Sequence, residues 1–122
     1  MKNIQLLNTK SIEQFTVSIN QVNDQRALLP HVLYKKMEGY TLKSVVPFHK
    51  VITSKPSLQR LNILKNAFLN DELIVKGVVK KLSAKELLIA VEVTKNIQDS
   101  NDVICNAIFG FELKEKYFEK AS

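Results

Sequence analysis

Cysteine and glycine are scarce in this chain of 122 residues, which has one cysteine and three glycines. The single cysteine, Cys105, excludes an internal disulfide, and no CxxC pair or close His/Cys spacing is present to hold zinc. The three glycines form no phosphate-binding loop. We therefore expect no structural metal and no glycine-rich nucleotide site.

Long apolar runs are also absent. No segment approaches the ~20 apolar residues that a membrane-spanning helix needs. The amino terminus, MKNIQLLNTK, lacks the continuous apolar stretch of a secretory signal. These absences predict a soluble cytoplasmic protein that makes no contact with a membrane. Hydrophobic residues make up 45% of the chain and charged residues 25%, which favours one globular domain over residues 1–122.

Basic residues are concentrated in one stretch. The formal net charge is +6, and residues 49–85 hold eight basic and two acidic residues, while the rest of the chain balances. Such a stretch attracts nucleic acid or a phosphorylated small molecule, or it coats a sheet face and keeps the protein soluble. Nucleic acid is the less favoured partner, because Phe68 is the only aromatic residue interleaved with these cations.

Hydrophobic periodicity predicts one strand, one helix and then a run of antiparallel strands. Alternation with a period of two marks the strands, and Pro30 suits the first turn of a helix that ends near Pro47. The expected elements are a strand over 15–20, a helix over 30–45, irregular strand segments over 51–54 and 58–63, a hairpin of 72–80 with 86–93, and a last strand over 103–111. This order predicts an α+β fold in which a curved antiparallel sheet covers the helix.

The predicted helix is apolar on more than one side. Leu29, Leu33, Met37 and Tyr40 follow at spacings of four and three, which is typical of a buried helical stripe. Further apolar residues widen this stripe, namely Leu28, Val32, Leu42, Val45 and Val46. We therefore expect the helix to be wrapped on more than one side. Phe68, Phe109 and Cys105 are interpreted as core residues.

Two known folds meet this description, the hotdog fold and the cystatin-like fold. The stretch VNDQRALLPHVLYKKMEGY resembles the first helix region of hotdog acyl-CoA thioesterases, with a match at Asn23, Leu28, Leu29, Leu33, Met37 and Glu38. FLNDELIV, LLIAVEV and NAIFGFEL are similar to later strands of that family. The chain departs from the family's pattern where Pro30 and His31 replace two glycines, Asn70 replaces a turn glycine and Glu38 replaces an aspartate.

The resemblance implies a thioesterase that hydrolyses an acyl thioester of coenzyme A or of acyl carrier protein. Glu38 would act as general base or nucleophile, and Asn23, fifteen positions earlier, would orient water or the thioester carbonyl. His31 would offer its amide N–H or imidazole to the oxyanion at the helix amino terminus. The family's site lies between subunits, so the resemblance implies a homodimer or a tetramer.

Coenzyme A would be part of the substrate and not a cofactor. Its three phosphates favour clustered cations, for which the basic stretch offers Arg60, Lys65, Lys80 and Lys81.

Other interpretations remain open at this point. Glu38 also suits a solvent-facing position on the helix, three residues after Lys35. His31 also suits the water-facing start of a helix, and Asn23 also suits a turn between strand and helix. The whole domain also suits a non-catalytic hotdog protein that binds an acyl ligand or acts as a structural partner. A third alternative is a hydroxyacyl dehydratase, because LPHVL resembles the start of the helix in that family. Lys36, however, stands where the dehydratase has its acidic residue. A cystatin-like inhibitor would need a QxVxG hairpin, which the sequence lacks.

Overall fold

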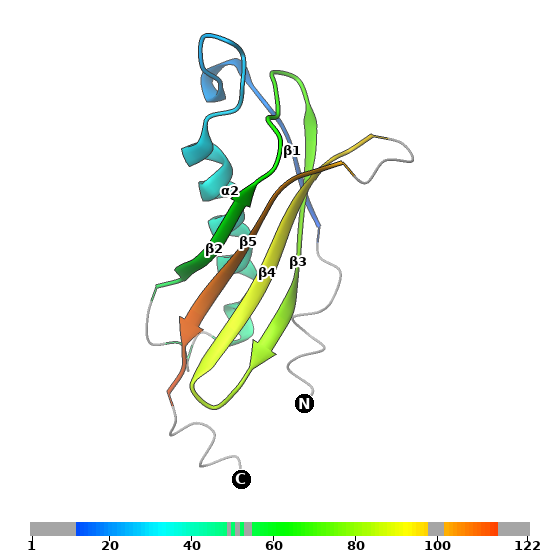
Figure 1. Cartoon of the computed structure of the whole chain (residues 1–122). Helices are drawn as coiled ribbons and strands as arrows, with labels where there is room; N and C mark the ends of the chain where they lie inside the picture. Colours follow the sequence, from blue (N-terminus) through cyan, green and yellow to red (C-terminus); the bar gives the residue numbers. More distant parts are fainter. Residues whose placement is uncertain (1–11, 49, 51, 53–54, 98–101, 115–122) are drawn as a thin grey trace.

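The computed structural model describes residues 12–48, 50, 52, 55–97 and 102–114. Figure 1 shows one long helix beside an antiparallel sheet. In chain order the elements are β1 (Glu13–Thr16), η1 (Ile19–Gln21), α2 (Pro30–Ser44), η2 (Val46–Phe48), β2 (Ser57–Ile63), β3 (Glu72–Leu82), β4 (Glu86–Lys95) and β5 (Val103–Glu112), where η marks a 3₁₀ helix.

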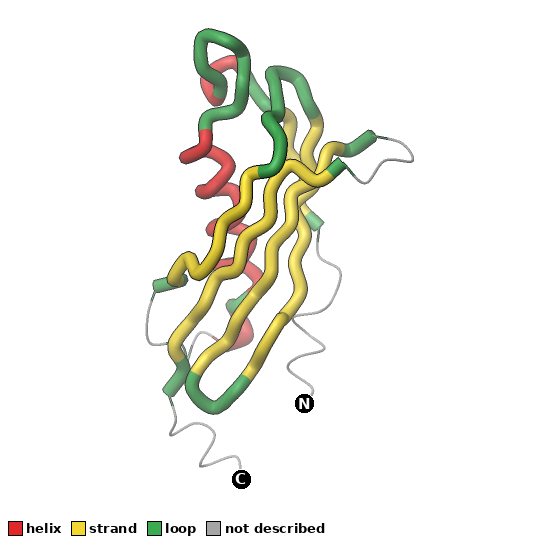
Figure 2. Tube along the Cα trace, viewed as in Figure 1, coloured by secondary structure: helices red, strands yellow, loops and turns green. Residues whose placement is uncertain are grey.

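The five strands form one sheet in the order β1-β3-β4-β5-β2, and every pairing is antiparallel. The helix α2 lies along one face of this sheet (Figure 2). We call the face turned toward α2 the inner face and the opposite one the outer face. The arrangement confirms the predicted α+β fold of one helix against a curved antiparallel sheet.

The element boundaries follow the sequence signals closely, with one clear difference. The first strand ends at Thr16 instead of reaching residue 20, because a short 3₁₀ helix begins at Ile19 and the Ser18 N–H donates to Gln21 Oε1. The predicted segment 51–54 falls almost wholly outside the described residues, and only Ile52 is seen, in a bridge with Leu113. The irregular strand over 58–63 is confirmed as β2, which has a bulge between Leu58 and Arg60.

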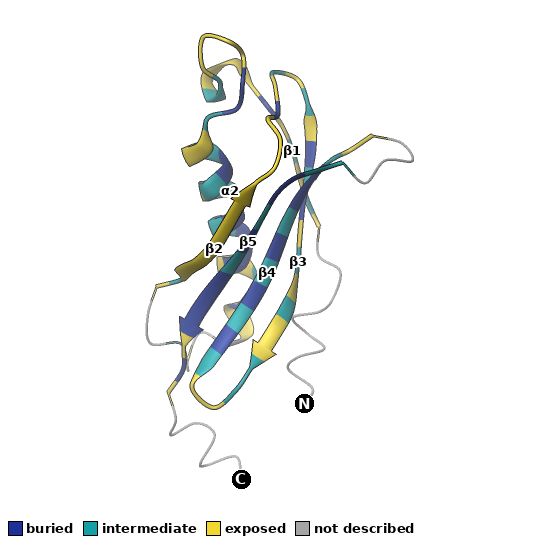
Figure 3. Cartoon of the chain, in the orientation of Figure 1, coloured by how far each residue is buried: buried dark blue, intermediate teal, exposed yellow. Residues whose placement is uncertain are grey.

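The core lies between α2 and the inner face (Figure 3). The helix buries Leu33, Met37, Tyr40 and Thr41, at spacings that place all four on one side. From the sheet come the alternate residues of the three central strands, including Leu73, Val75, Ile89, Val91, Val93, Cys105, Ala107 and Phe109. The predicted helical stripe and the interpretation of Cys105 and Phe109 as core residues are thereby confirmed.

Three expectations about burial are wrong. Leu42 is 46% exposed and Val46 is 59% exposed, so these two residues of the widened stripe are not covered within this chain. Phe68 is 43% exposed, because its backbone is held in a bridge with Ala27 at the rim of the domain. Leu28 and Val45, which also widen the stripe, are buried, so the arc is covered in part.

Two positions owe their residue type to the backbone or to close packing. Gly77 of β3 faces α2, and an added methyl group would come within 2.9 Å of both the Ala90 carbonyl oxygen and Tyr40 Cε1. The missing side chain lets the Tyr40 ring pack against the sheet. Asn70, which stands where the resembling family has a turn glycine, has φ 73°, a left-handed conformation that asparagine tolerates better than most residues.

The thiol of Cys105 is fully buried, and burial raises its pKa to about 11. An unfolded cysteine ionises near pH 8.5, so between about pH 8.5 and 11 the unfolded state loses this proton while the folded state keeps it. The free energy of unfolding should therefore fall as the pH rises through this window, by up to about 1.4 kcal/mol per pH unit.

The measurement is urea unfolding of wild type and Cys105→Ala at pH 8 and pH 10. The cavity left by the substitution lowers the free energy of unfolding equally at both pH values. A difference between the two proteins in how this free energy changes with pH therefore reports the ionisation of the thiol. An identical pH dependence in the two proteins would contradict the assignment.

Within the described part of the chain, no helix is long and apolar enough to cross a membrane. The same residues contain no group of His, Cys, Asp and Glu side chains placed to hold a metal ion.

Candidate functional site

Glu38 lies near the middle of α2, on a half-buried flank of the helix. The Tyr34 hydroxyl, one helical turn earlier, donates a hydrogen bond of 3.1 Å to Glu38 Oε2. The carboxylate is therefore held by a neutral donor on its own helix. This arrangement leaves Oε1 available to a water molecule or a substrate.

Tyr34 is itself held in place by the sheet. Its ring lies 5.9 Å from that of Phe109, centroid to centroid, at an interplanar angle of 45°. Burial, together with the hydrogen bond to Glu38 and the nearby negative charge, raises the pKa of Tyr34 above its ordinary value. Tyr34 therefore stays protonated at neutral pH and remains a donor to the carboxylate. Phe109 of β5 thus holds the Tyr34 ring, and the Tyr34 hydroxyl in turn holds the Glu38 carboxylate.

Asn23 organises the loop that leads into α2. Its Oδ1 accepts hydrogen bonds from the backbone N–H groups of Gln25 and Ala27, at 2.9 and 3.0 Å, and its carbonyl oxygen accepts from Arg26 N–H. Arg26 consequently adopts φ 66°. These bonds confirm that Asn23 is a turn residue. The side-chain Nδ2 of Asn23 is exposed and has no acceptor among the described residues, so it can still donate to a ligand.

The amino terminus of α2 carries an amide donor that the helix does not use. Leu29 is the N-cap and Pro30, without an N–H, is the first helical residue. The N–H groups of Val32 and Leu33 both point to the Leu29 carbonyl oxygen, whereas that of His31 has no acceptor within the part of the chain that is described. The His31 side chain is exposed. An anion or a polarised carbonyl would meet this N–H at the positive end of the helix dipole.

Within one chain, the structure does not bring Glu38 together with the other two predicted catalytic residues. Glu38 follows Pro30 by eight residues, which is about 12 Å along a helix axis. The loop that holds Asn23 lies beyond the amino terminus of α2, on the side away from Glu38 (Figure 1). Asn23 and His31 therefore lie at one end of the helix and Glu38 at its middle.

The four cations predicted to bind phosphate do not form one cluster. Lys65 pairs with Asp102, and this hydrogen bond holds the pKa of Asp102 below its ordinary value. Lys81 pairs with Glu86 at 2.9 Å. Arg60 and Lys80 line a common groove of about 850 Å³ on the outer face, so the sheet separates them from Glu38 of the same chain.

Tyr34 is the residue that the sequence analysis missed. The signal was present, because a hydroxyl four residues before a carboxylate on a helix lies on the same face. It was obscured by the aromatic ring, which also suits an ordinary core position.

One helix packed on a five-stranded antiparallel sheet of this order defines the hotdog fold, as predicted. Solved structures of hotdog acyl-CoA thioesterases are similar to this chain. Acyl-CoA hydrolase from Staphylococcus aureus, in complex with butyryl coenzyme A, superposes with a TM-score of 0.71 at 12% identity, over 90% of this chain and 65% of the hydrolase. The chain thus spans just under two thirds of that enzyme's length.

Two further neighbours are nearer to this chain in size. The PaaI protein of the phenylacetic acid degradation operon of Escherichia coli has a TM-score of 0.69 at 12% identity, over 84% of this chain and 75% of its own. A hypothetical thioesterase protein from Streptococcus pneumoniae, solved with coenzyme A, has a TM-score of 0.68 at 16% identity, over 91% of this chain and 90% of its own. No protein-family model and no curated protein sequence matches the chain.

Proposed function

We propose that this protein is a thioesterase that hydrolyses an acyl thioester of coenzyme A or of acyl carrier protein, with Glu38 as general base or nucleophile. The observation that carries the proposal is the Glu38 carboxylate on the central helix, held by the Tyr34 hydroxyl at 3.1 Å. Hotdog neighbours whose names describe acyl-CoA hydrolysis support the substrate class.

The spacing of Asn23 and Glu38 also supports the proposal. Hotdog acyl-CoA hydrolase from Staphylococcus aureus has been solved with an asparagine and with an aspartate changed to alanine, and those two residues are fifteen positions apart in that enzyme. Asn23 and Glu38 are also fifteen positions apart. Glutamate in place of aspartate keeps the carboxylate and extends its reach by one methylene group.

In the proposed reaction, Glu38 removes a proton from water as the water oxygen attacks the thioester carbonyl carbon. The oxyanion that develops accepts hydrogen bonds from the free His31 N–H and from Asn23 Nδ2. Collapse of the tetrahedral intermediate breaks the C–S bond, and the thiolate takes up the proton, which gives a carboxylic acid and a free thiol. If Glu38 instead attacks the carbonyl carbon directly, the C–S bond breaks and the thiolate leaves, which gives an acyl-enzyme anhydride. Water then hydrolyses the anhydride to the carboxylic acid, which restores Glu38, and the thiolate takes up the proton that the water releases.

Because Glu38 and Asn23 lie apart within one chain, the proposal requires two subunits. The edge strand β2 supports a homodimer, since all seven of its residues are exposed, including Leu58, Leu61 and Ile63. An open, apolar strand edge of this kind pairs readily with a second copy. Two β2 edges related by a two-fold axis would place both α2 helices antiparallel on one side of a continuous sheet. The amino terminus of one helix would then face the Glu38 half of the other.

Tyr34→Phe tests the support of the carboxylate. The ring and its contact with Phe109 are kept, and only the hydroxyl that donates to Glu38 is lost. We expect kcat to fall by about fivefold with little change in KM, because a positioning hydrogen bond contributes on the order of 1 kcal/mol. Unchanged kcat, or a rise in KM alone, would show that the hydroxyl does not position the base.

The experiment that tests the proposed function is release of free thiol from short, long and aromatic acyl-CoAs, followed with wild type and Glu38→Gln side by side. Turnover by wild type that the substitution abolishes supports the proposal. Absence of thiol release by both proteins, from every acyl-CoA and from an acyl carrier protein thioester, would overturn it.

A non-catalytic hotdog domain that binds an acyl ligand is the second candidate. Pro30 favours it, because this proline removes one amide donor from the helix amino terminus, where the resembling family has glycine. Binding of an acyl-CoA without turnover, unaffected by Glu38→Gln, would support this alternative.

A further inference from the structure

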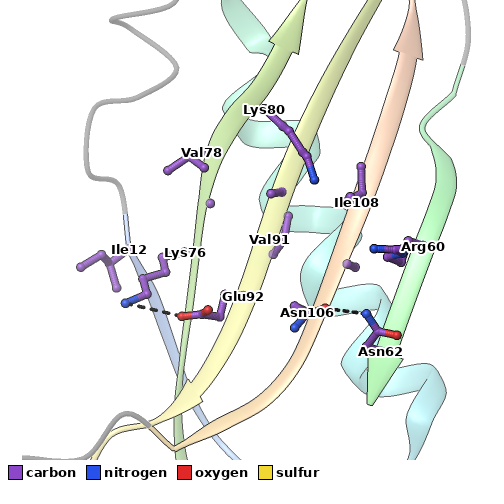
Figure 4. A pocket seen from close by; sticks show the side chains of 13 residues that line it. Ile12, Arg60, Asn62, Lys76, Val78, Lys80, Val91, Glu92, Asn106 and Ile108 are labelled. Carbon is purple, nitrogen blue, oxygen red and sulfur yellow. Dashed lines mark hydrogen bonds and ion pairs between the residues drawn. The ribbon is translucent and has the colours of Figure 1, made fainter. Parts of the chain in front are cut away.

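The outer face carries an apolar row that crosses three strands and ends at a cation on a fourth. Val78 of β3 lies opposite Ala90 of β4, Ala90 opposite Ile108 of β5, and Ile108 opposite Arg60 of β2. Val78 is 56% exposed. The side chains of Val78, Ala90 and Ile108 form the floor of the groove of about 850 Å³ on this face (Figure 4).

Cations border this floor on both sides. Lys76 and Lys80 of β3 stand on one flank and Arg60 of β2 on the other (Figure 4). A neighbouring polar row is already satisfied internally, because Lys76 meets Glu92 at 3.8 Å and Asn62 donates to Asn106 at 3.0 Å. Arg60 and Lys80 have no acidic partner among the described residues. The row through Val78, Ala90 and Ile108 is therefore apolar, with the unpaired cations Lys80 and Arg60 on its two flanks, and a polar row of paired side chains runs beside it.

The dimensions of the groove match an α-helix. Four strands at a spacing of ~4.8 Å put the two flanks about 14 Å apart, and a helix with its side chains is ~10–12 Å wide. Lys76 and Lys80 are four positions apart on one strand, about 13 Å, which is close to the rise of eight helical residues. Since Lys76 is paired with Glu92, Lys80 is the cation that a carboxylate on a docked helix would meet on this flank.

We propose that the outer face binds an acidic amphipathic helix of a partner protein. The apolar side of that helix lies on Val78, Ala90 and Ile108, and its carboxylates pair with Lys80 on one flank and Arg60 on the other. Because this face is turned away from α2, the partner docks without covering Glu38. The inference goes beyond the proposed hydrolysis and does not depend on it.

Charge and composition favour this occupant over the others. A second copy would bring Arg60 and Lys80 against the same cations. Nucleic acid would find no aromatic side chain in the groove lining on which a base could stack. A small anionic amphiphile needs a cation at one end, whereas here the cations line both sides of an exposed floor.

The test uses a stapled helical peptide with leucine and alanine along one side and glutamate on both flanks. Its affinity for the full chain is measured by fluorescence anisotropy, and its site by backbone amide shifts of ¹⁵N-labelled protein. We expect saturable binding that weakens with salt, with shifts at Val78, Ala90 and Ile108. In the double variant Arg60→Glu/Lys80→Glu the affinity should fall by roughly tenfold.

Two controls make the result decisive. The double variant Lys55→Glu/Lys114→Glu makes the same change of charge at exposed lysines outside the groove, and it should bind within about twofold of wild type. A peptide with lysine in place of glutamate should not bind.

Four results would each overturn the proposal. The first is absence of saturable binding up to millimolar peptide, and the second is an equal loss of peptide affinity in both double variants. The third is a set of amide shifts confined to α2. The fourth is a set of amide shifts on the outer face that depend on protein concentration alone. The last of these would identify a second copy of this chain as the occupant.

Discussion

Glu38→Gln is expected to lower kcat for acyl thioester hydrolysis by at least about a hundredfold, because a positioned general base contributes ~10²–10⁴. Glutamine keeps the size of the side chain, and its amide oxygen still accepts the hydrogen bond from the Tyr34 hydroxyl. The substitution therefore removes the ability to accept a proton or to attack, with little change in packing. KM should change far less than kcat, since the carboxylate acts on the reacting atoms.

Glu13→Gln is the matched control. Glu13 of β1 is a partly exposed glutamate that pairs with Lys43 of α2 at 2.9 Å, so its neutralisation removes one surface ion pair from the same helix. Wild-type kcat is expected for this variant. A loss of activity in Glu13→Gln as large as in Glu38→Gln would show that both act through the fold and not through catalysis.

Gly77→Ala is expected to lower the free energy of unfolding by about 2 kcal/mol. The new methyl group would stand 2.9 Å from the Ala90 carbonyl oxygen, which is fixed in the sheet, and 2.9 Å from Tyr40 Cε1. Since Tyr40 is buried and the Ala90 oxygen belongs to the backbone, relief requires α2 to move away from the sheet. The measurement is the urea midpoint together with its slope, which separates lower stability from a change in the unfolded state.

Gly39→Ala makes the same chemical change at a position with the opposite surroundings. Gly39 lies within α2, and an added methyl group there has nothing within 4 Å among the described residues. Alanine should therefore raise the free energy of unfolding by about 0.5–1 kcal/mol, because it favours the helix and restricts the unfolded chain. Destabilisation at Gly39, or none at Gly77, would contradict the packing of α2 on the sheet.

The sequence predicted the fold well because its signals are local and periodic. Leu73, Val75 and Val79 alternate with charged residues in β3, and the buried residues of β4 follow the same period of two, which marks both strands and the face that each buries. Pro30 and the stripe through Leu33 and Met37 likewise determine where α2 begins and which side packs. The burial of Leu42, Val46 and Phe68 was predicted wrongly, because it depends on how far the sheet curves around the helix, which no local pattern encodes.

The candidate site was less predictable for a related reason. Two bulges help to determine which cations lie on the outer face, because a bulge shifts the simple alternation of side chains along a strand. One lies between Val79 and Lys81 in β3, and the other between Leu58 and Arg60 in β2. Periodicity gave no means to foresee that Arg60 and Lys80 share a groove while Lys65 and Lys81 pair with acids. The separation of Asn23 from Glu38 follows from the length of α2 and was implicit in the spacing.

Complementation between two inactive variants tests the central claim most directly, namely that Glu38 of one subunit works with Asn23 of another. Asn23→Asp keeps the oxygen that accepts from Gln25 and Ala27 but loses the amide donor, so the loop is preserved. Glu38→Gln removes the base. In a heterodimer of the two, one site combines both substitutions and the other is intact.

The measurement is thiol release after the two variants are unfolded together and refolded as a mixture. Half of the dimers should be mixed, each with one working site, so the activity should recover to about a quarter of the wild-type value. Activity that stays at the level of the separately refolded variants would contradict a site shared between two copies of this chain.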